Sequence, residues 1–204
     1  MNEIIPGIFM WSRLSEPHGY NFNGHLVEHE DDNICVDPVA PDAATLEEIV
    51  EKGVTQIVLT NRNHTRGANE VRARTGAPVS IHTDDAAHAR TQGTEIDAEL
   101  VVGEHVGPFE IVDASGKSPG EVALFWRQRR ILIVGDVLIG SPKGRCALLP
   151  DDKMDDPARL RDSVRRLYGL YFETLLMGDG APIRHDARIP LAALISTLGN
   201  PTAA

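Results

Sequence analysis

The chain has 204 residues, of which 42% are hydrophobic and 25% are charged. This composition is ordinary for a globular protein and excludes disorder, collagen and coiled coil as descriptions of the whole chain. The formal net charge is −10, and residues 1–60 carry 11 acidic side chains against two basic ones. Nucleic acid and anionic membranes attract clustered Lys and Arg, so we expect neither of them as a partner.

The sequence also indicates in which cellular compartment the protein is found. Its two cysteines, Cys35 and Cys146, are too few and too far apart for a disulfide framework. The first residues lack the basic segment and the long apolar run of a signal peptide, and no apolar stretch approaches the length of a membrane span. We therefore expect a cytoplasmic protein.

The hydrophobic pattern of the first half alternates strands and helices. It predicts strands over 4–11, 22–28 and 33–37, then a helix that begins after Asp42 and ends at Gly53. A buried strand over 56–60 follows, then a helix over 66–75, a strand over 78–82 and a short helix over 84–93.

The second half opens with several short strands and turns over 95–115. A hairpin is predicted over 122–136, a helix over 157–168, a strand that enters a glycine loop over 173–180, and a last helix over about 187–198. No linker or internal repeat interrupts the chain. The sequence therefore predicts one domain over 1–204, with sheets inside and helices outside.

Four loops carry the polar residues that suggest a site. Residues 59–68 (LTNRNHTRGA) follow a buried strand and open a helix, which is where α/β proteins place functional residues. Residues 114–120 (ASGKSPG), 134–138 (VGDVL) and 177–182 (MGDGAP) each put a polar residue beside glycine at a strand end. Together they predict one site.

With its polar loops in this order, the chain resembles the metallo-β-lactamase fold superfamily of hydrolases over nearly its whole length. That family has Leu-Thr followed by His-x-His-x-Asp-His, then Pro-Gly-His-Thr-Pro-Gly, Gly-Asp and a late Gly-His-Gly. These side chains hold one or two metal ions, usually zinc. The resemblance implies an αββα sandwich of the α+β class, in which two mixed β-sheets pack face to face with helices on the outside.

The usual ligands do not carry over to this chain. Only the aspartate of Gly-Asp is retained, as Asp136, and His64 falls on a variable position of the motif. The other six positions hold Asn61, Asn63, Thr65, Arg66, Lys117 and Asp179.

Zinc binds imidazole, thiolate or carboxylate, whereas Asn is a poor zinc ligand and cationic Arg and Lys repel a metal ion. We therefore expect no dinuclear zinc site and no required cofactor. If zinc or another divalent cation such as Mg²⁺ or Mn²⁺ binds, the oxygens of Asp136, Asp179, Asn61 and Asn63 are the candidate ligands. Our hypothesis is that Arg66 and Lys117, facing Asp136 and Asp179, replace the charge of the metal.

Three residues are candidates for catalysis, and each has a structural alternative. His64 has a suitable intrinsic pKa for acid–base work, although a loop histidine more often only forms hydrogen bonds. Asp136 is a base or an anchor for Lys117, and the anchor is favoured. Lys117 is an amine nucleophile or, by preference, a salt-bridged lysine, since nearby carboxylates favour its charged form.

Other residues are candidates for binding or for purely structural roles. Asn61, Asn63 and Arg66 are expected to contact a substrate, although loop asparagines more often bond nearby backbone. His82 is a weaker candidate because it opens the loop after a strand. Glu121 is expected to face solvent or to pair with an arginine, and His25 is expected on the surface.

The sequence is compatible with two functions. The first is a metal-free pseudoenzyme that binds a small molecule or a protein. The second is an active hydrolase of a small ester, thioester or lactone with an atypical mononuclear or hard-cation site. A homodimer is plausible, although no particular residue indicates one.

Overall fold

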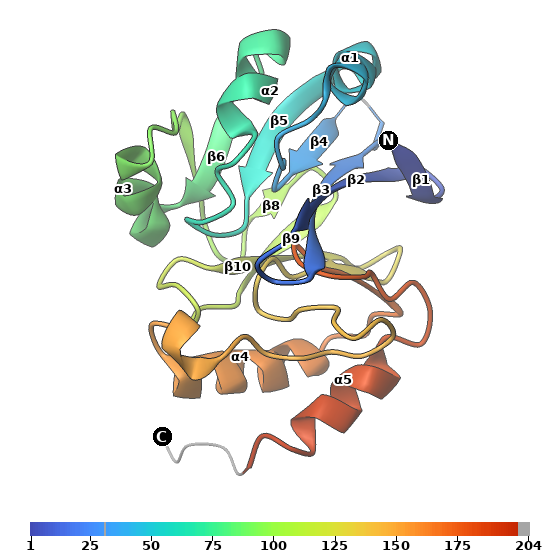
Figure 1. Ribbon diagram of the computed structural model, residues 1–204, viewed down its shortest axis with the longest axis vertical. Coiled ribbons are helices and arrows are strands. Elements are labelled where there is room, and N and C mark those ends of the chain that lie inside the picture. Colours follow the sequence, from blue (N-terminus) through green and yellow to red (C-terminus); the bar gives the residue numbers. More distant parts are fainter. Residues whose placement is uncertain (31, 200–204) are drawn as a thin grey trace.

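The computed structural model describes residues 1–30 and 32–199. Two β-sheets pack against each other, and helices cover both outer faces (Figure 1). This is the αββα sandwich that the resemblance predicted.

The first sheet has seven strands that lie side by side in sequence order. The strands β1 to β4 are antiparallel and β4 to β7 are parallel, so the sheet is mixed. They are β1 (Asn2–Ile5), β2 (Ile8–Ser15), β3 (Tyr20–Val27), β4 (Asn33–Val36), β5 (Val54–Leu59), β6 (Val79–His82) and β7 (Ala98–Leu100).

The second sheet has five strands in the order β12-β11-β10-β9-β8. It is antiparallel except for β11 and β12, which are parallel. Its strands are β8 (His105–Val106), β9 (Phe109–Asp113), β10 (Val122–Trp126), β11 (Ile131–Ile133) and β12 (Thr174–Leu176).

The helices cover the two outer faces. The helices α1 (Ala43–Lys52), α2 (Ala68–Thr75) and α3 (Thr83–Thr91) share an apolar cluster with the first sheet, and α4 (Pro157–Tyr168) and α5 (Arg188–Ile195) share one with the second. A short 3-10 helix, Asp151–Lys153, precedes α4. Asp42 caps α1 by accepting from the Thr45 N–H at 2.8 Å, and Asp156 caps α4 by accepting from the Arg159 N–H at 2.9 Å.

A third apolar cluster fills the space between the sheets. It combines branched residues such as Ile34 and Val58 from the first sheet with Phe109, Leu124 and Ile133 from the second. Strands buried on both faces explain why segments such as 131–134 are apolar throughout rather than alternating.

The sequence predictions differ from the structure mainly at element boundaries. The predicted strand over 4–11 is two strands, because Gly7 adopts a left-handed conformation with φ +74° and reverses the chain. The last helix ends at Ile195 rather than near residue 198. Among the described residues, no helix is both long enough and apolar enough to cross a membrane.

Candidate functional site

The polar loops that the sequence singled out meet at one end of the sandwich. Residues 60–66 follow β5, residues 114–121 connect β9 to β10, Asp136 follows β11 and Asp179 follows β12. The loop after β12 is fixed to β3, because the Asn23 side-chain amide donates to the carbonyls of Met177 at 3.0 Å and Gly180 at 2.7 Å. Five separate segments therefore position the site.

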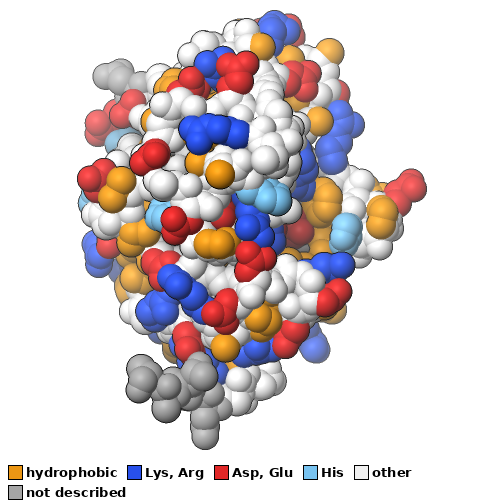
Figure 2. Space-filling view, turned by 90° about the vertical axis from the view of Figure 1, so that its left-hand side faces the viewer, with side chains coloured by type: hydrophobic (Ala, Val, Ile, Leu, Met, Phe, Trp, Pro, Cys, Tyr) orange, Lys and Arg blue, Asp and Glu red, His pale blue; other side chains and the backbone are white. Residues whose placement is uncertain are grey.

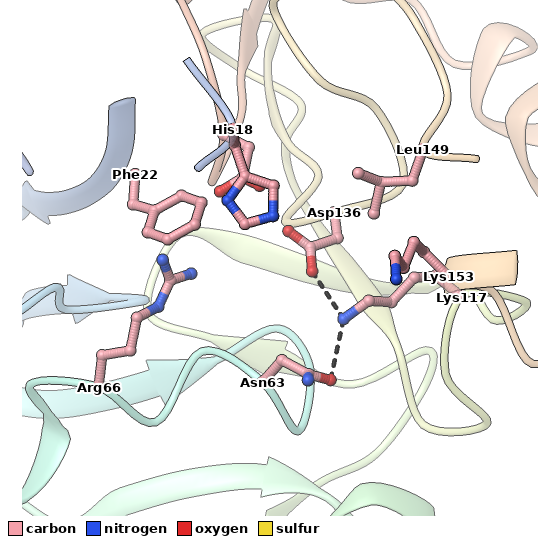
Figure 3. Close-up of a pocket in the computed structure, with 9 residues that line it drawn as sticks. His18, Phe22, Asn63, Arg66, Lys117, Asp136, Leu149 and Lys153 are labelled. Carbon is pink, nitrogen blue, oxygen red and sulfur yellow. Dashed lines mark hydrogen bonds and ion pairs between the residues drawn. The ribbon is translucent and has the colours of Figure 1, made fainter. Parts of the chain in front are cut away.

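Lys117 lies at the centre of the site. Its Nζ is 2.6 Å from Asp136 Oδ2 and donates to Asn63 Oδ1 at 2.9 Å (Figure 3). It also donates to Asn61 Oδ1 at 3.4 Å. Burial opposes the charge on Lys117, but Asp136 and then Glu121 outweigh it and raise the lysine pKa. Lys117 is therefore a buried ammonium group, and the favoured interpretation of Asp136 as its anchor agrees with this geometry.

His64 lies between two aspartates and is 1% exposed. Its Nδ1 is 2.9 Å from Asp37 Oδ2, and its Nε2 is 2.8 Å from Asp136 Oδ1. Burial disfavours the charged ring, but Asp136 and Asp37 outweigh that effect and raise the pKa of His64 to about 10. Both ring nitrogens therefore carry protons at neutral pH, and His64 is an imidazolium in a buried ion-pair network.

Asp136 joins the two cations. One of its oxygens contacts His64 and the other contacts Lys117. Burial favours the neutral acid, but the charges of His64 and Lys117 lower the pKa of Asp136 far below its usual range. We call Asp37, His64, Asp136 and Lys117 the buried network, in which two anions balance two cations.

Glu121 corrects a sequence-based expectation. It neither faces solvent nor pairs with an arginine: it is 1% exposed, and its Oε1 accepts from the Asn61 amide at 3.2 Å and the Asp136 N–H at 3.0 Å. Burial raises the pKa of Glu121 to about 8, so the neutral acid predominates at pH 7. The residue follows a Pro-Gly turn, and that turn directs it inward instead of to the surface.

Two glycines of the motifs make room for the network. A Cβ on Gly178 would lie 2.4 Å from His64 Cε1, and one on Gly135 would lie 2.3 Å from Thr60 Oγ1. Gly135 also has φ +51°, which disfavours other residues. These glycines let the His64 ring and Thr60 lie against the ends of β11 and β12.

Asp85 of α3 ties two of the site loops together. It is fully buried and accepts from the Arg62 N–H at 2.9 Å, the Ser118 hydroxyl at 2.5 Å and the Gly120 N–H at 3.0 Å. The first donor belongs to the loop of Asn61 and Asn63, and the other two belong to the loop of Lys117. Asp85 therefore fixes the loop of Asn61 and Asn63 relative to the loop of Lys117.

A cavity of about 310 Å³ opens beside the buried network. We call it the central cavity. Its walls include Lys117 and Asp136, His18 and Phe22 from the β2–β3 hairpin, Arg66 from the loop before α2, and Asp179. Figure 3 shows the Arg66 guanidinium directed at the Phe22 ring, with His18 above and Leu149 and Lys153 on the opposite side. Figure 2 shows basic and acidic side chains interspersed over one whole face of the molecule.

Arg66 and Asp179 line this cavity without pairing. The guanidinium carbon of Arg66 lies 4.2 Å from the centre of the Phe22 ring, a cation–π contact. Asp179 is 5% exposed, and its Oδ1 is buried without a hydrogen-bond partner. Burial and the charge of Asp136 raise the pKa of Asp179 to about 7.

The hypothesis of a four-charge replacement is thus met only in part. The pair of Lys117 with Asp136 forms, but Arg66 and Asp179 form no ion pair with each other among the described residues. The charge that balances the second anion comes from His64, and that anion is Asp37, which the sequence analysis read only as the end of a strand.

Other predicted residues lie away from the cavity. Thr65 donates its hydroxyl to Gln92 Oε1 at 2.9 Å, and His82 caps α3 by accepting from the Asp84 N–H at 3.3 Å. His82 does not line the central cavity. His25 is fully buried, which corrects the expectation of a surface residue, and burial lowers its pKa to about 4.

Sequence reasoning missed several site residues. Phe22 and Asp37 lie at the ends of predicted strands, Asp85 lies in a predicted helix and His18 lies between two predicted strands, and no motif marks them. Asp37 alone had a local signal, since it is an acidic residue immediately after the apolar run of β4 and before Pro38. The other contacts depend on how the loops come together.

A family model described as the metallo-beta-lactamase superfamily matches residues 3–198. The chain belongs to this superfamily. It is 32% identical over 179 residues to a hydroxyacylglutathione hydrolase of Methylobacterium sp. (strain 4-46), and 31% identical to one of Methylobacterium nodulans; each match covers 83% of this chain and 66% of the relative. It is 28% identical over 149 residues to the probable metallo-hydrolase YqgX of Bacillus subtilis, covering 62% of this chain and 71% of that protein.

Solved structures agree on the fold of this superfamily member. The mono-zinc form of the metallo-beta-lactamase FIM-1 from Pseudomonas aeruginosa aligns over 95% of this chain and 93% of its own, with TM-score 0.74 and 19% identity. The di-iron form of TTHA1623 aligns over 94% and 98%, with TM-score 0.67 and 22% identity. These two structures thus hold zinc and iron, respectively, on this fold.

Proposed function

We propose that this protein binds a small molecule in a metal-free pocket of the metallo-β-lactamase fold. One observation carries the proposal: the ammonium group of Lys117 is held by Asp136, Asn63 and Asn61, the positions where the family places metal ligands. A cation already occupies the point on which these oxygens converge. A second cation there would be repelled, and Asn is a poor ligand for zinc.

A mononuclear hydrolase is the second candidate. It is favoured by the ligand atoms of His64, Asp136 and Asp179, which lie within 4.8 Å of one another, and by the names of the curated relatives. Such an enzyme would act on a small ester, thioester or lactone. A metal-bound imidazole must present a lone pair, however, and both nitrogens of His64 are engaged by aspartates. The residues therefore do not fit a metal without breaking the buried network.

Metal analysis separates the two candidates. We expect protein purified without chelator to contain far less than one equivalent of zinc, iron or manganese. We also expect its melting temperature to be unchanged by Zn²⁺, Mn²⁺ or EDTA, because a ligand that binds only the folded state would raise it. Stoichiometric metal, or a clear melting shift that EDTA reverses, would overturn the proposal.

Ligand restoration provides a matched control. The double variant Arg66→His/Lys117→His keeps both asparagines, so we expect no tight zinc binding. Adding Asn61→His and Asn63→His supplies two more imidazole ligands at family positions, and we expect zinc binding to rise. Tight zinc binding by the double variant would mean that the asparagines are not the limiting feature.

A further inference from the structure

The central cavity is lined by one guanidinium and one carboxyl group that have no hydrogen-bond or ion-pair partner among the described residues. The guanidinium of Arg66 is held over the Phe22 ring, but among the described residues it donates no hydrogen bond and forms no ion pair. The Asp179 carboxyl is 5% exposed, lines the same cavity, and has a buried oxygen without a partner. Buried polar groups are normally satisfied, so an unpartnered carboxyl directed into a cavity indicates a missing donor.

The remaining charges near the cavity are already compensated. In the buried network, Asp37 and Asp136 balance His64 and Lys117, and both oxygens of Asp136 are engaged. Lys153 lies at the rim, 3.4 Å from Asp152 Oδ2. The cavity therefore has two ionisable groups without a partner, one guanidinium and one carboxyl, and they are contributed by different segments.

The two groups are separate but electrostatically close. They do not pair with each other, yet the charge of Arg66 still acts on Asp179. A ligand that places an anion at Arg66 and a cationic donor at Asp179 would satisfy both without changing the net charge of the pocket. Phe22 and Leu149 supply apolar surface for the rest of such a molecule.

We propose that Arg66 and Asp179 together recognise a small zwitterionic amino carboxylate with an apolar body, whose carboxylate binds the guanidinium and whose ammonium group binds the Asp179 carboxylate. The inference rests on the proposed metal-free pocket, since a metal held by Asp179 would occupy its oxygens. The cavity volume of about 310 Å³ limits the ligand to the size of an amino acid or a short derivative.

The test compares ligands that differ by one charged group. Isothermal titration calorimetry is run on the full chain with L-phenylalanine, with 3-amino-3-phenylpropanoate, which spaces the charges further apart, and with the truncated molecules 3-phenylpropanoate and 2-phenylethylamine. We expect at least one zwitterion to bind about tenfold more tightly than either truncated molecule, because each loses one charge-assisted contact. Equal affinity for a truncated molecule, or no binding of either zwitterion, overturns the proposal.

Variants test which residue binds each charged group of the ligand. We expect Arg66→Gln to weaken the zwitterion and 3-phenylpropanoate alike by about tenfold, and Asp179→Asn to remove the preference for the zwitterion while it leaves 3-phenylpropanoate binding intact. Arg90→Gln and Glu70→Gln make the same charge changes outside the cavity and should bind like the parent chain. An undiminished zwitterion preference in Asp179→Asn contradicts the assignment.

The outcomes also separate this inference from the function on which it rests. Melting curves establish that each variant is folded, and metal content is measured on the same samples. Stoichiometric metal defeats the proposed function. A metal-free protein that shows no zwitterion preference defeats only the ligand assignment.

Discussion

Two halves of the site use charge in opposite ways. The buried network pairs every charge, because Asp136 contacts both His64 and Lys117 while Asp37 contacts the other nitrogen of His64. Across the cavity, Arg66 and Asp179 lie within electrostatic reach of each other but are left unpaired. The difference separates charges that stabilise the fold from charges that are available to a ligand.

The largest expected effect comes from breaking the buried network at its shared anion. Asp136→Asn removes the group that compensates two buried cations, and breaking a buried pair costs about 3–5 kcal/mol. We expect the free energy of unfolding, measured in urea, to fall by about that amount. Asp179→Asn is the matched control on the other half, and a similar loss there would erase the distinction between the halves.

A smaller loss is expected at the residue that aligns the two loops of the network. Asp85→Asn keeps the size of the side chain but replaces one acceptor oxygen by a donor, which then opposes an N–H or a hydroxyl. Hydrogen bonds to charged groups contribute about 1.5–3 kcal/mol each, so we expect a loss of about 2–3 kcal/mol. Asp84→Asn, one residue earlier on α3 and exposed, should be near neutral in the same urea titration.

The pH dependence of stability has overlapping contributions from the two halves, and Glu121, whose pKa burial raises to about 8, adds a decline between pH 4.5 and about 8. His64 has a raised pKa in the folded state, so its contribution is fully present below its ordinary pKa of 6.5 and is lost as pH rises through about 10. Asp179 is an acid whose pKa is raised to about 7, so stability also falls as pH rises from 3.8 to about 7. Unfolding measured from pH 4 to pH 10 should show these declines.

A single variant isolates the Asp179 contribution to that profile. In Asp179→Asn, we expect a smaller decline between pH 4 and pH 7, because the titrating group is gone. The decline between pH 6.5 and pH 10 should persist, since His64, Asp37 and Asp136 are untouched. A profile that changes only above pH 7 would contradict the assignment of the lower decline to Asp179.

The smallest effect on stability is expected at Arg66. Its guanidinium makes a cation–π contact with Phe22 and no ion pair among the described residues, and an exposed contact of this kind is worth about 0.5–1 kcal/mol. We therefore expect Arg66→Gln to change the free energy of unfolding by less than about 1 kcal/mol. A loss of stability as large as that of Asp136→Asn would mean that Arg66 stabilises the fold as the buried network does.

The fold was largely predictable because local signals agreed with the tertiary structure. The helix 157–168 was predicted at its observed bounds, since Asp156 and Pro157 mark its start and its leucines and valine recur at the helical period. The hairpin 122–136 followed from two apolar runs around a charged turn. The strand over 4–11 was merged because a single glycine between apolar residues does not by itself signal a reversal.

The sequence predicted most of the residues that form the candidate site, but only some of the contacts between them. The sequence by itself determined which residues stand at the family's ligand positions, that most are chemically unsuited to zinc, and that Lys117 would need an anion such as Asp136. Only the tertiary structure decided that His64 takes a second aspartate, that Glu121 turns inward and that Arg66 stacks on Phe22. The physical reason is that ion pairing depends on distances of a few ångströms between loops far apart in the chain, and the packing of the two sheets sets those distances.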